Sequence, residues 1–143
     1  MSNELVLDSS AALSWIFMDE ATPESDRLHE RLADGARAWV PTLWHLEICN
    51  VLLTAVRRQR TTMEKAKDFF IRMQAFDINV DPDTMTNAWS QTHTLAIRHQ
   101  LTAYDAAYDA AYLELALRRG LPLATKDEAL TAAAQTVGVE LCL

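Results

Sequence analysis

Three carboxylates lie close together in the C-terminal third of the sequence, in segments that are otherwise apolar. Asp105 and Asp109 stand four residues apart in the first turns of a predicted helix that ends at Gly120. A short apolar strand follows and leads to Asp127. Acids at the start of a buried helix and at the end of a buried strand supply the hard oxygen ligands that cations such as Mg²⁺ prefer. We interpret these acids as half of a metal site.

Two further acids occupy comparable positions earlier in the chain. Asp8 ends an apolar run that begins at Glu4, and Glu47 lies in the second turn of a long helix predicted from Thr42. Two divalent ions about 3.5–4 Å apart can activate water and stabilise the leaving oxygen of a phosphodiester, which requires several converging carboxylates. The sequence offers no Ser-His-Asp arrangement, zinc-ligand spacing or Gly-rich phosphate loop as an alternative. The acids therefore fit metal-dependent hydrolysis.

Each acid taken alone has a simpler explanation. Asp105 has the position of a helix cap, and Asp127 could cap a helix that starts at the next residue. Asp8 and Glu47 could be ordinary surface acids. The metal-site hypothesis depends on all of them meeting in one place.

Strands that alternate with helices must bring the acids together. Gly35, Gly120 and Gly138 each follow a predicted helix and precede a predicted strand, where a left-handed residue favours glycine. We expect strands over residues 4–8, 36–40, 76–80 and 139–143, a short strand before Asp127, and helices over 9–17, 22–34, 42–57, 62–73, 83–100, 101–119 and 128–136.

This alternation predicts one α/β domain over residues 1–143, with a parallel sheet flanked by helices on both faces. Sites in such sheets form beyond the carboxyl ends of the strands. Asp8 and Asp127 both follow strands, so we expect them at the same edge of the sheet.

Composition limits the class of protein. Half of the 143 residues are apolar, and no apolar run reaches the roughly 20 residues of a membrane helix. The first residues lack the pattern of a signal peptide, and Cys49 and Cys142 have no metal or redox spacing, so we expect a cytoplasmic protein with reduced thiols. The net charge of −7 argues against a general nucleic-acid coat but not against a metal-dependent nuclease.

Four segments together resemble a known family. Residues 6–13, 43–52, 108–116 and 121–127 look like the motifs of PIN-domain ribonucleases, and more narrowly of the VapC toxins of bacterial type II toxin–antitoxin pairs. This resemblance implies Mg²⁺- or Mn²⁺-dependent endonucleolytic cleavage of RNA, often a tRNA or another structured RNA. It also implies a homodimer and inhibition by a cognate VapB-like antitoxin whose tail fills the acidic groove.

The resemblance also assigns roles to individual residues. Asp8, Glu47 and Asp127 match the first, second and fourth acids of the family, and Thr125 matches its small hydroxyl residue. Lys126 could face an RNA phosphate. The candidate substrate contacts are Ser9, Thr125 and Lys126.

The third acid departs from the family pattern, which has a single Tyr-Asp-Ala-x-Tyr. Here Tyr104-Asp-Ala-Ala precedes Tyr108-Asp-Ala-Ala-Tyr, as if one helical turn had been inserted. The family interval back from Asp127 leads to Asp109, whereas the expected helix start leads to Asp105. We favour Asp109, because an extra turn is most easily accommodated at the free end of the helix. Asp105 shares its face and could hold a water or a second ion.

Two other functions compete with a nuclease. If the extra turn moves the third acid out of reach, the chain is a catalytically impaired PIN-fold interaction module. A phosphatase of the haloacid-dehalogenase type also begins with a strand that ends in Asp, but it needs a second Asp two residues later, where this chain has Ser10.

A basic helix end is formed by Arg57, Arg58 and Arg60. It is either a solvated charge run or a phosphate contact.

Overall fold

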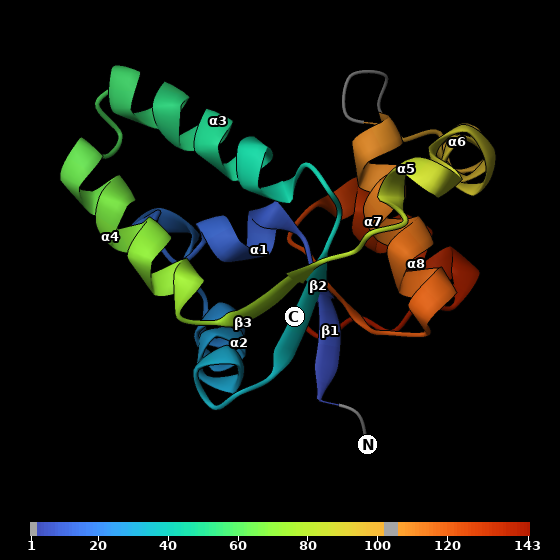
Figure 1. Ribbon diagram of the computed structural model, residues 1–143, viewed down its shortest axis with the longest axis horizontal. Coiled ribbons are helices and arrows are strands. Elements are labelled where there is room, and N and C mark those ends of the chain that lie inside the picture. The colour runs from blue at the N-terminus through green and yellow to red at the C-terminus, as the bar shows by residue number, and fades with distance from the viewer. Residues whose placement is uncertain (1–2, 102–105) are drawn as a thin grey trace.

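Parallel strands form the centre of the structure, a computed structural model that describes residues 3–101 and 106–143. Within those ranges the sheet has four strands in the order β3-β2-β1-β4 (Figure 1). All neighbouring strands run parallel. The strands are β1 (Glu4–Leu7), β2 (Arg37–Val40), β3 (Asp77–Val80) and β4 (Leu123–Ala124).

Helices cover both faces of this sheet. In Figure 1, α1 to α4 lie mainly to the left of β1 and β2, and α5 to α8 lie to the right. The α-helices are α1 (Ser9–Leu13), α2 (Pro23–Ala33), α3 (Trp44–Arg57), α4 (Met63–Gln74), α5 (Thr84–Asn87), α6 (His93–Arg98), α7 (Ala106–Arg119) and α8 (Glu128–Val137). A 3-10 turn (Met18–Glu20) and a π-helical turn, η2 (Ala88–Thr92), complete the described helical segments. The predicted α/β fold with a parallel sheet is confirmed.

The buried position of β1 explains its sequence. Leu5, Val6 and Leu7 are fully buried, because β1 pairs with β2 on one side and β4 on the other while helices cover its faces. A strand enclosed in this way is a continuous apolar run instead of an alternating one. No described helix combines the length and apolar character needed to cross a bilayer.

Helix ends follow the capping residues of the sequence. Thr22 and Ser25 form a capping box at the start of α2, and the Thr62 side chain accepts a hydrogen bond of 3.1 Å from the Lys65 amide at the start of α4. Gly138 ends α8 with a left-handed φ of 81°. These boundaries agree with the sequence prediction.

Three predicted elements differ in the structure. Residues 139–143 are not a strand: only Leu141 forms a bridge, to Leu123, because the adjacent β4 is just two residues long. The helix predicted over residues 83–100 is interrupted by η2. The first helix ends at Leu13, since the Ser14 hydroxyl donates to the Ala11 carbonyl and competes with the helical pattern.

A buried ion cluster joins α7 to the end of β3. Asp81, with a fully buried side chain, accepts hydrogen bonds from Arg118 at 2.7 Å and forms an ion pair with Arg119 at 2.9 Å. Arg118 also pairs with Glu114 at 2.6 Å, and the Arg119 guanidinium lies 3.6 Å from the centre of the Trp39 ring. Burial alone would raise the pKa of Asp81, but the two arginines outweigh it and hold the pKa below its usual value. The cluster fixes the C-terminal half of α7 against the sheet.

Candidate active site

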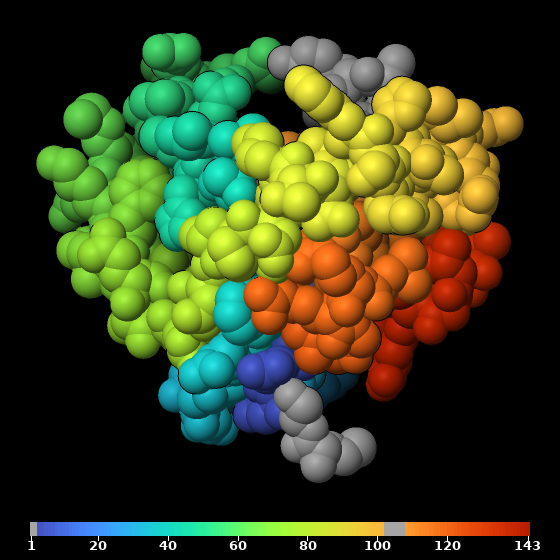
Figure 2. All heavy atoms as spheres, turned by 45° about the vertical axis from the view of Figure 1, so that its right-hand side comes forward, coloured from blue at the N-terminus to red at the C-terminus, as the bar shows by residue number. Residues whose placement is uncertain are grey.

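A groove opens where the direction of strand addition reverses. The chain adds β2 and β3 on one side of β1 and then places β4 on the other, so the carboxyl ends of β1 and β4 meet at a topological switch point. The groove holds about 800 Å³ and lies beside α3. Figure 2 shows that the surface is hollowed on one side of α3. Its polar walls are Asp8, Ser9, Ser10, Glu47, Asn50, Tyr108, Asp109 and Asp127.

Asp8 forms the floor of this groove. It follows β1 directly and is only 3% exposed. Ser10 donates a hydrogen bond of 2.7 Å to Asp8 Oδ2, and Thr125 donates one of 2.6 Å to the same oxygen. Burial raises the pKa of Asp8, and the nearby charge of Asp127 adds to the rise, while the hydroxyl donors oppose it. A neighbouring cation would stabilise the ionised form of a carboxylate that is buried in this way.

Glu47 approaches Asp8 through Ser9. The Ser9 hydroxyl lies 3.4 Å from Asp8 Oδ1 and makes a short hydrogen bond with Glu47 Oε1. Glu47 belongs to the first turn of α3, whereas Ser9 begins α1. The two predicted acids, 39 residues apart, are therefore bridged by one hydroxyl group.

The loop after β4 is tied to Asp8 by hydroxyl groups. Thr125 Oγ1 accepts a hydrogen bond of 3.0 Å from the Asp127 amide while donating to Asp8. Ser10 Oγ likewise accepts one of 2.9 Å from the Lys126 amide. Thr125 is buried, so the structure places it behind the acids and not at the surface of the groove.

The Asp127 side chain both caps a helix and lines the groove. Its Oδ1 accepts a hydrogen bond of 2.8 Å from the Leu130 amide and caps α8, as the simpler explanation predicted. The same side chain also lines the groove with Asp8 and Glu47. A carboxylate has two oxygens, so capping does not prevent it from facing a cation.

The third acid lies at the N-terminal end of α7. Asp109 is in the first described turn of this helix and lines the groove. Asp105 lies outside the described residues, so the preference for Asp109 remains a prediction. The positive end of the helix dipole favours an acid at the position of Asp109.

Lys126 points away from the groove walls. Its ammonium contacts the carbonyl oxygen of Glu20, beyond the end of α1. Among the three candidate substrate contacts, only Ser9 lines the groove.

Sequence reasoning missed three polar groups at the site. Ser10 and two tyrosines surround the acids: the Tyr112 hydroxyl accepts a hydrogen bond of 3.4 Å from the Ser9 amide, and Tyr108 lies beside Glu47. Burial, and then the charges of Asp8 and Glu47, raise the pKa of Tyr112, so its phenol stays protonated. The four-residue spacing of the tyrosines was the available signal, since it places both on one face of the helix.

Comparison with known proteins identifies the family. The model of the PIN domain matches residues 5–135, nearly the whole chain. The chain belongs to the PIN domain family. PIN domains are generally metal-dependent nucleases, so the acid groove lies in a fold whose members hydrolyse nucleic acids.

One solved structure shows the same fold. PAE2754 from Pyrobaculum aerophilum is 22% identical over 91% of this chain and 84% of that one, with a TM-score of 0.64. Comparison with curated proteins gave no match. PIN-domain membership gives no support to the haloacid-dehalogenase alternative, and the position that would need its second Asp holds Ser10, which donates to Asp8.

The donor set of the groove fits a hard divalent cation. Four carboxylates contribute oxygen atoms from the end of β1, α3, α7 and the loop after β4, which suits Mg²⁺ or Mn²⁺. Among the described residues, no group of three or more acids, histidines or cysteines stands close enough to hold one ion directly. Glu47 and Asp127 are turned toward Ser9 and the Leu130 amide, so cation binding requires side-chain rotation or bridging waters.

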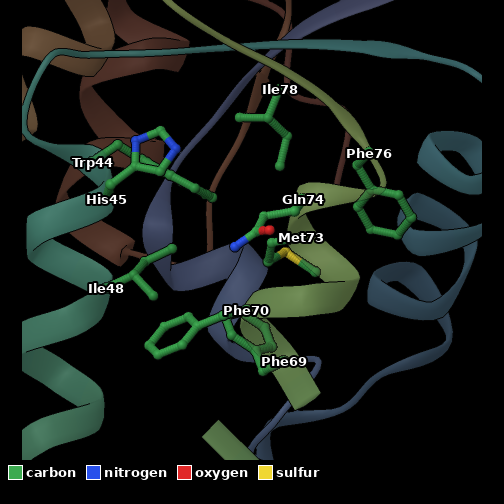
Figure 3. Close-up of a pocket in the computed structure, with 9 residues that line it drawn as sticks. All are labelled: Trp44, His45, Ile48, Phe69, Phe70, Met73, Gln74, Phe76 and Ile78. Atoms are coloured by element: carbon green, nitrogen blue, oxygen red, sulfur yellow. The ribbon is translucent and has the colours of Figure 1, made fainter. Parts of the chain in front are cut away.

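A second cavity, of about 320 Å³, lies between α3 and α4 (Figure 3). Its walls are mostly apolar and include Phe69, Phe70 and Met73 of α4, and the Phe70 ring extends toward α3. It contains no carboxylate and belongs to the packing of these helices.

Replacing Thr125 by Val should weaken divalent-cation binding and lower kcat/KM for nucleic-acid hydrolysis by about 10- to 100-fold, the usual cost of losing the hydrogen-bond partner of a ligand. Val keeps the shape but removes the donor to Asp8 and the acceptor of the Asp127 amide. Thr125→Ser keeps both and should retain activity within a few-fold. Equal activity of the Val and Ser variants would contradict this role.

Proposed function

We propose that this PIN domain is a metal-dependent endoribonuclease and the toxin of a type II toxin–antitoxin pair of the VapBC kind. The observation that supports it is the convergence of Asp8, Glu47, Asp109 and Asp127, from four separate elements, on one groove at the switch point of the sheet. The motif resemblance adds RNA as the substrate.

Each acid has a distinct part in this proposal. A bound Mg²⁺ or Mn²⁺ would supply Lewis acidity and an activated water for phosphodiester hydrolysis. Asp8 supplies the most buried ligand and is held in place by Ser10 and Thr125. Glu47 and Asp127 supply further oxygens, and Asp109 approaches from α7. Asp105, four residues earlier in the sequence, is a further candidate ligand.

The partners of the proposed nuclease follow from the resemblance. We expect a cognate VapB-like antitoxin that occupies the acid groove, a tRNA or other structured RNA as substrate, a cytoplasmic location and a homodimer. A gene for a short DNA-binding antitoxin beside this one would support the pairing.

One observation favours a second candidate, the catalytically impaired interaction module. Two of the acids already have local donors, and the described residues contain no ready-made metal cluster. In that case the chain would bind its partner and cut no RNA.

Metal titration separates these two functions. We expect RNA cleavage in Mg²⁺ or Mn²⁺, its loss in EDTA, and stabilisation by about 2.7 kcal/mol at a cation concentration 100 times Kd. That gain corresponds to a rise in Tm of roughly 5–10 °C. Asp34→Asn, which alters an exposed acid on α2's C-terminal end, should behave like the parent. If the parent shows neither RNA cleavage nor a thermal shift on addition of the cation, this result would favour the interaction module.

A further inference from the structure

The acid groove continues along α3. Another hollow, of about 310 Å³ and distinct from the apolar cavity between α3 and α4, shares Asn50 and Val51 with the acid groove. It extends toward the C-terminal end of α3. We call this hollow the basic arm. Its remaining walls are Phe17, Thr54, Ala55, Arg58 and Arg60. One path therefore leads from the carboxylates to a cationic end.

A line of polar side chains follows this path on one face of α3. Glu47, Asn50, Thr54 and Arg58 are separated by three, four and four residues, the spacing that places side chains on the same face of a helix. At about 1.5 Å per residue, Arg58 lies roughly 16 Å along the axis from Glu47. The line begins with a carboxylate and ends with a guanidinium group, with an amide and a hydroxyl between them.

The two arginines of the basic arm differ in charge compensation. Arg60 pairs with Asp19 at 3.1 Å and Glu20 at 3.3 Å and stacks over Phe17 at 3.9 Å. Arg58 is exposed and makes no ion pair within the described part of the chain. In a protein of net charge −7, this is an uncompensated positive charge inside a groove. An anionic ligand is the natural partner for it.

We propose that the basic arm binds the phosphate backbone of a single RNA strand on one side of the bond that is cut. This inference rests on the nuclease function proposed above. Arg58 holds a phosphate, while Asn50 and Thr54 contact phosphate or ribose oxygens between Arg58 and the acids. Contacts of this kind fix the register of a strand without reading its bases. The arm would thus direct a chosen phosphate toward Asp8.

A structural role for the basic helix end is the competing explanation. Arg57 and Arg58 both lie at the C-terminal end of α3, where cations stabilise the helix dipole. Arg57 is also exposed, but it does not line the basic arm. Substituting Arg57 therefore removes the same charge from the same helix end and leaves the groove unchanged, which makes it a matched control.

The test compares the parent chain with Arg58→Ala and Arg57→Ala. Binding of a fluorescent single-stranded RNA is measured over a range of salt concentrations, with Ca²⁺ in place of Mg²⁺ so that the strand is not cut. Arg58→Ala should bind about 3- to 10-fold more weakly at low salt, and the slope of log K against log salt should fall by about 0.7. Arg57→Ala should bind like the parent within twofold. Thermal unfolding should be alike for both variants.

Equal losses in the two variants, no loss in either, or no RNA binding by the parent would each overturn the basic-arm proposal. Cleavage in Mg²⁺ or Mn²⁺ is measured alongside. A parent that binds RNA through Arg58 but never cuts it would disprove the nuclease and leave the basic arm standing. A parent that cuts RNA while both variants bind equally well would disprove the basic arm alone.

Discussion

Asp8→Asn should lower kcat/KM for RNA cleavage by more than about 100-fold, the upper range for losing a mere partner of a metal ligand. Asn has the same shape but lacks the charge that would hold a cation at the floor of the groove. Cleavage of a labelled RNA in Mg²⁺ and in Mn²⁺ measures the effect. Asp34→Asn, which removes an exposed acid at the C-terminal cap of α2, should cleave like the parent.

The same Asp8 variant should fold without loss. Because burial raises the pKa of Asp8, its ionised form costs folding free energy once the pH exceeds the unfolded value of about 3.9. Asn removes that cost, so the metal-free variant should be at least as stable as the parent at neutral pH in urea unfolding. A folded variant that still cuts RNA would contradict the assignment of Asp8.

Asp81→Asn should lower the free energy of unfolding by about 3 kcal/mol, since breaking a buried ion pair by removing one partner is strongly destabilising. Within the described residues, Arg119 loses its carboxylate partner, and Arg118 keeps only Glu114 and the exposed Asp83. Asp81 is fully buried between Arg118 and Arg119. Its neighbour Asp83 is 56% exposed and 3.8 Å from Arg118, so Asp83→Asn should cost less than about 1 kcal/mol. Urea unfolding of the two variants gives the comparison.

The difference in unfolding free energy between the parent and Asp81→Asn should become smaller as the pH is lowered. The folded pKa of Asp81 lies below its unfolded value, so its contribution is present above about pH 4 and is lost as the pH falls toward the folded pKa. The gap between the parent and Asp81→Asn should therefore narrow on acidification. A gap that stays constant or widens would show that the ionised carboxylate is not what stabilises the fold.

Local patterns predicted much of the fold. Thr22 with Pro23 marks the start of α2, and the apolar run before Asp8 marks the central strand, because these signals depend on neighbours along the chain. Parallel topology then places Asp8 and Asp127 at one edge without further information.

Other features depend on tertiary contacts that no local pattern encodes. The approach of Glu47 to Ser9 is set by how α3 packs on α1, and the direction of Lys126 by a carbonyl group 106 residues away. The apolar residues from Val139 onward have strand character, yet they lack a partner strand long enough to pair with. The Asp81 cluster joins residues 37 and 38 positions apart, beyond the reach of helix or strand periodicity.

Because β1 is fully enclosed, the segments around the groove should differ in the free energy of local opening. Amide hydrogens of a fully buried central strand exchange with solvent chiefly through global unfolding, whereas exposed helix ends open at far lower cost. Asp8 directly follows this strand, the part of the molecule that we expect to open last, whereas Glu47 and Asp109 lie in the first turns of α3 and α7, near helix ends. On warming, we therefore expect the helix ends that carry Glu47 and Asp109 to open before the strand that precedes Asp8.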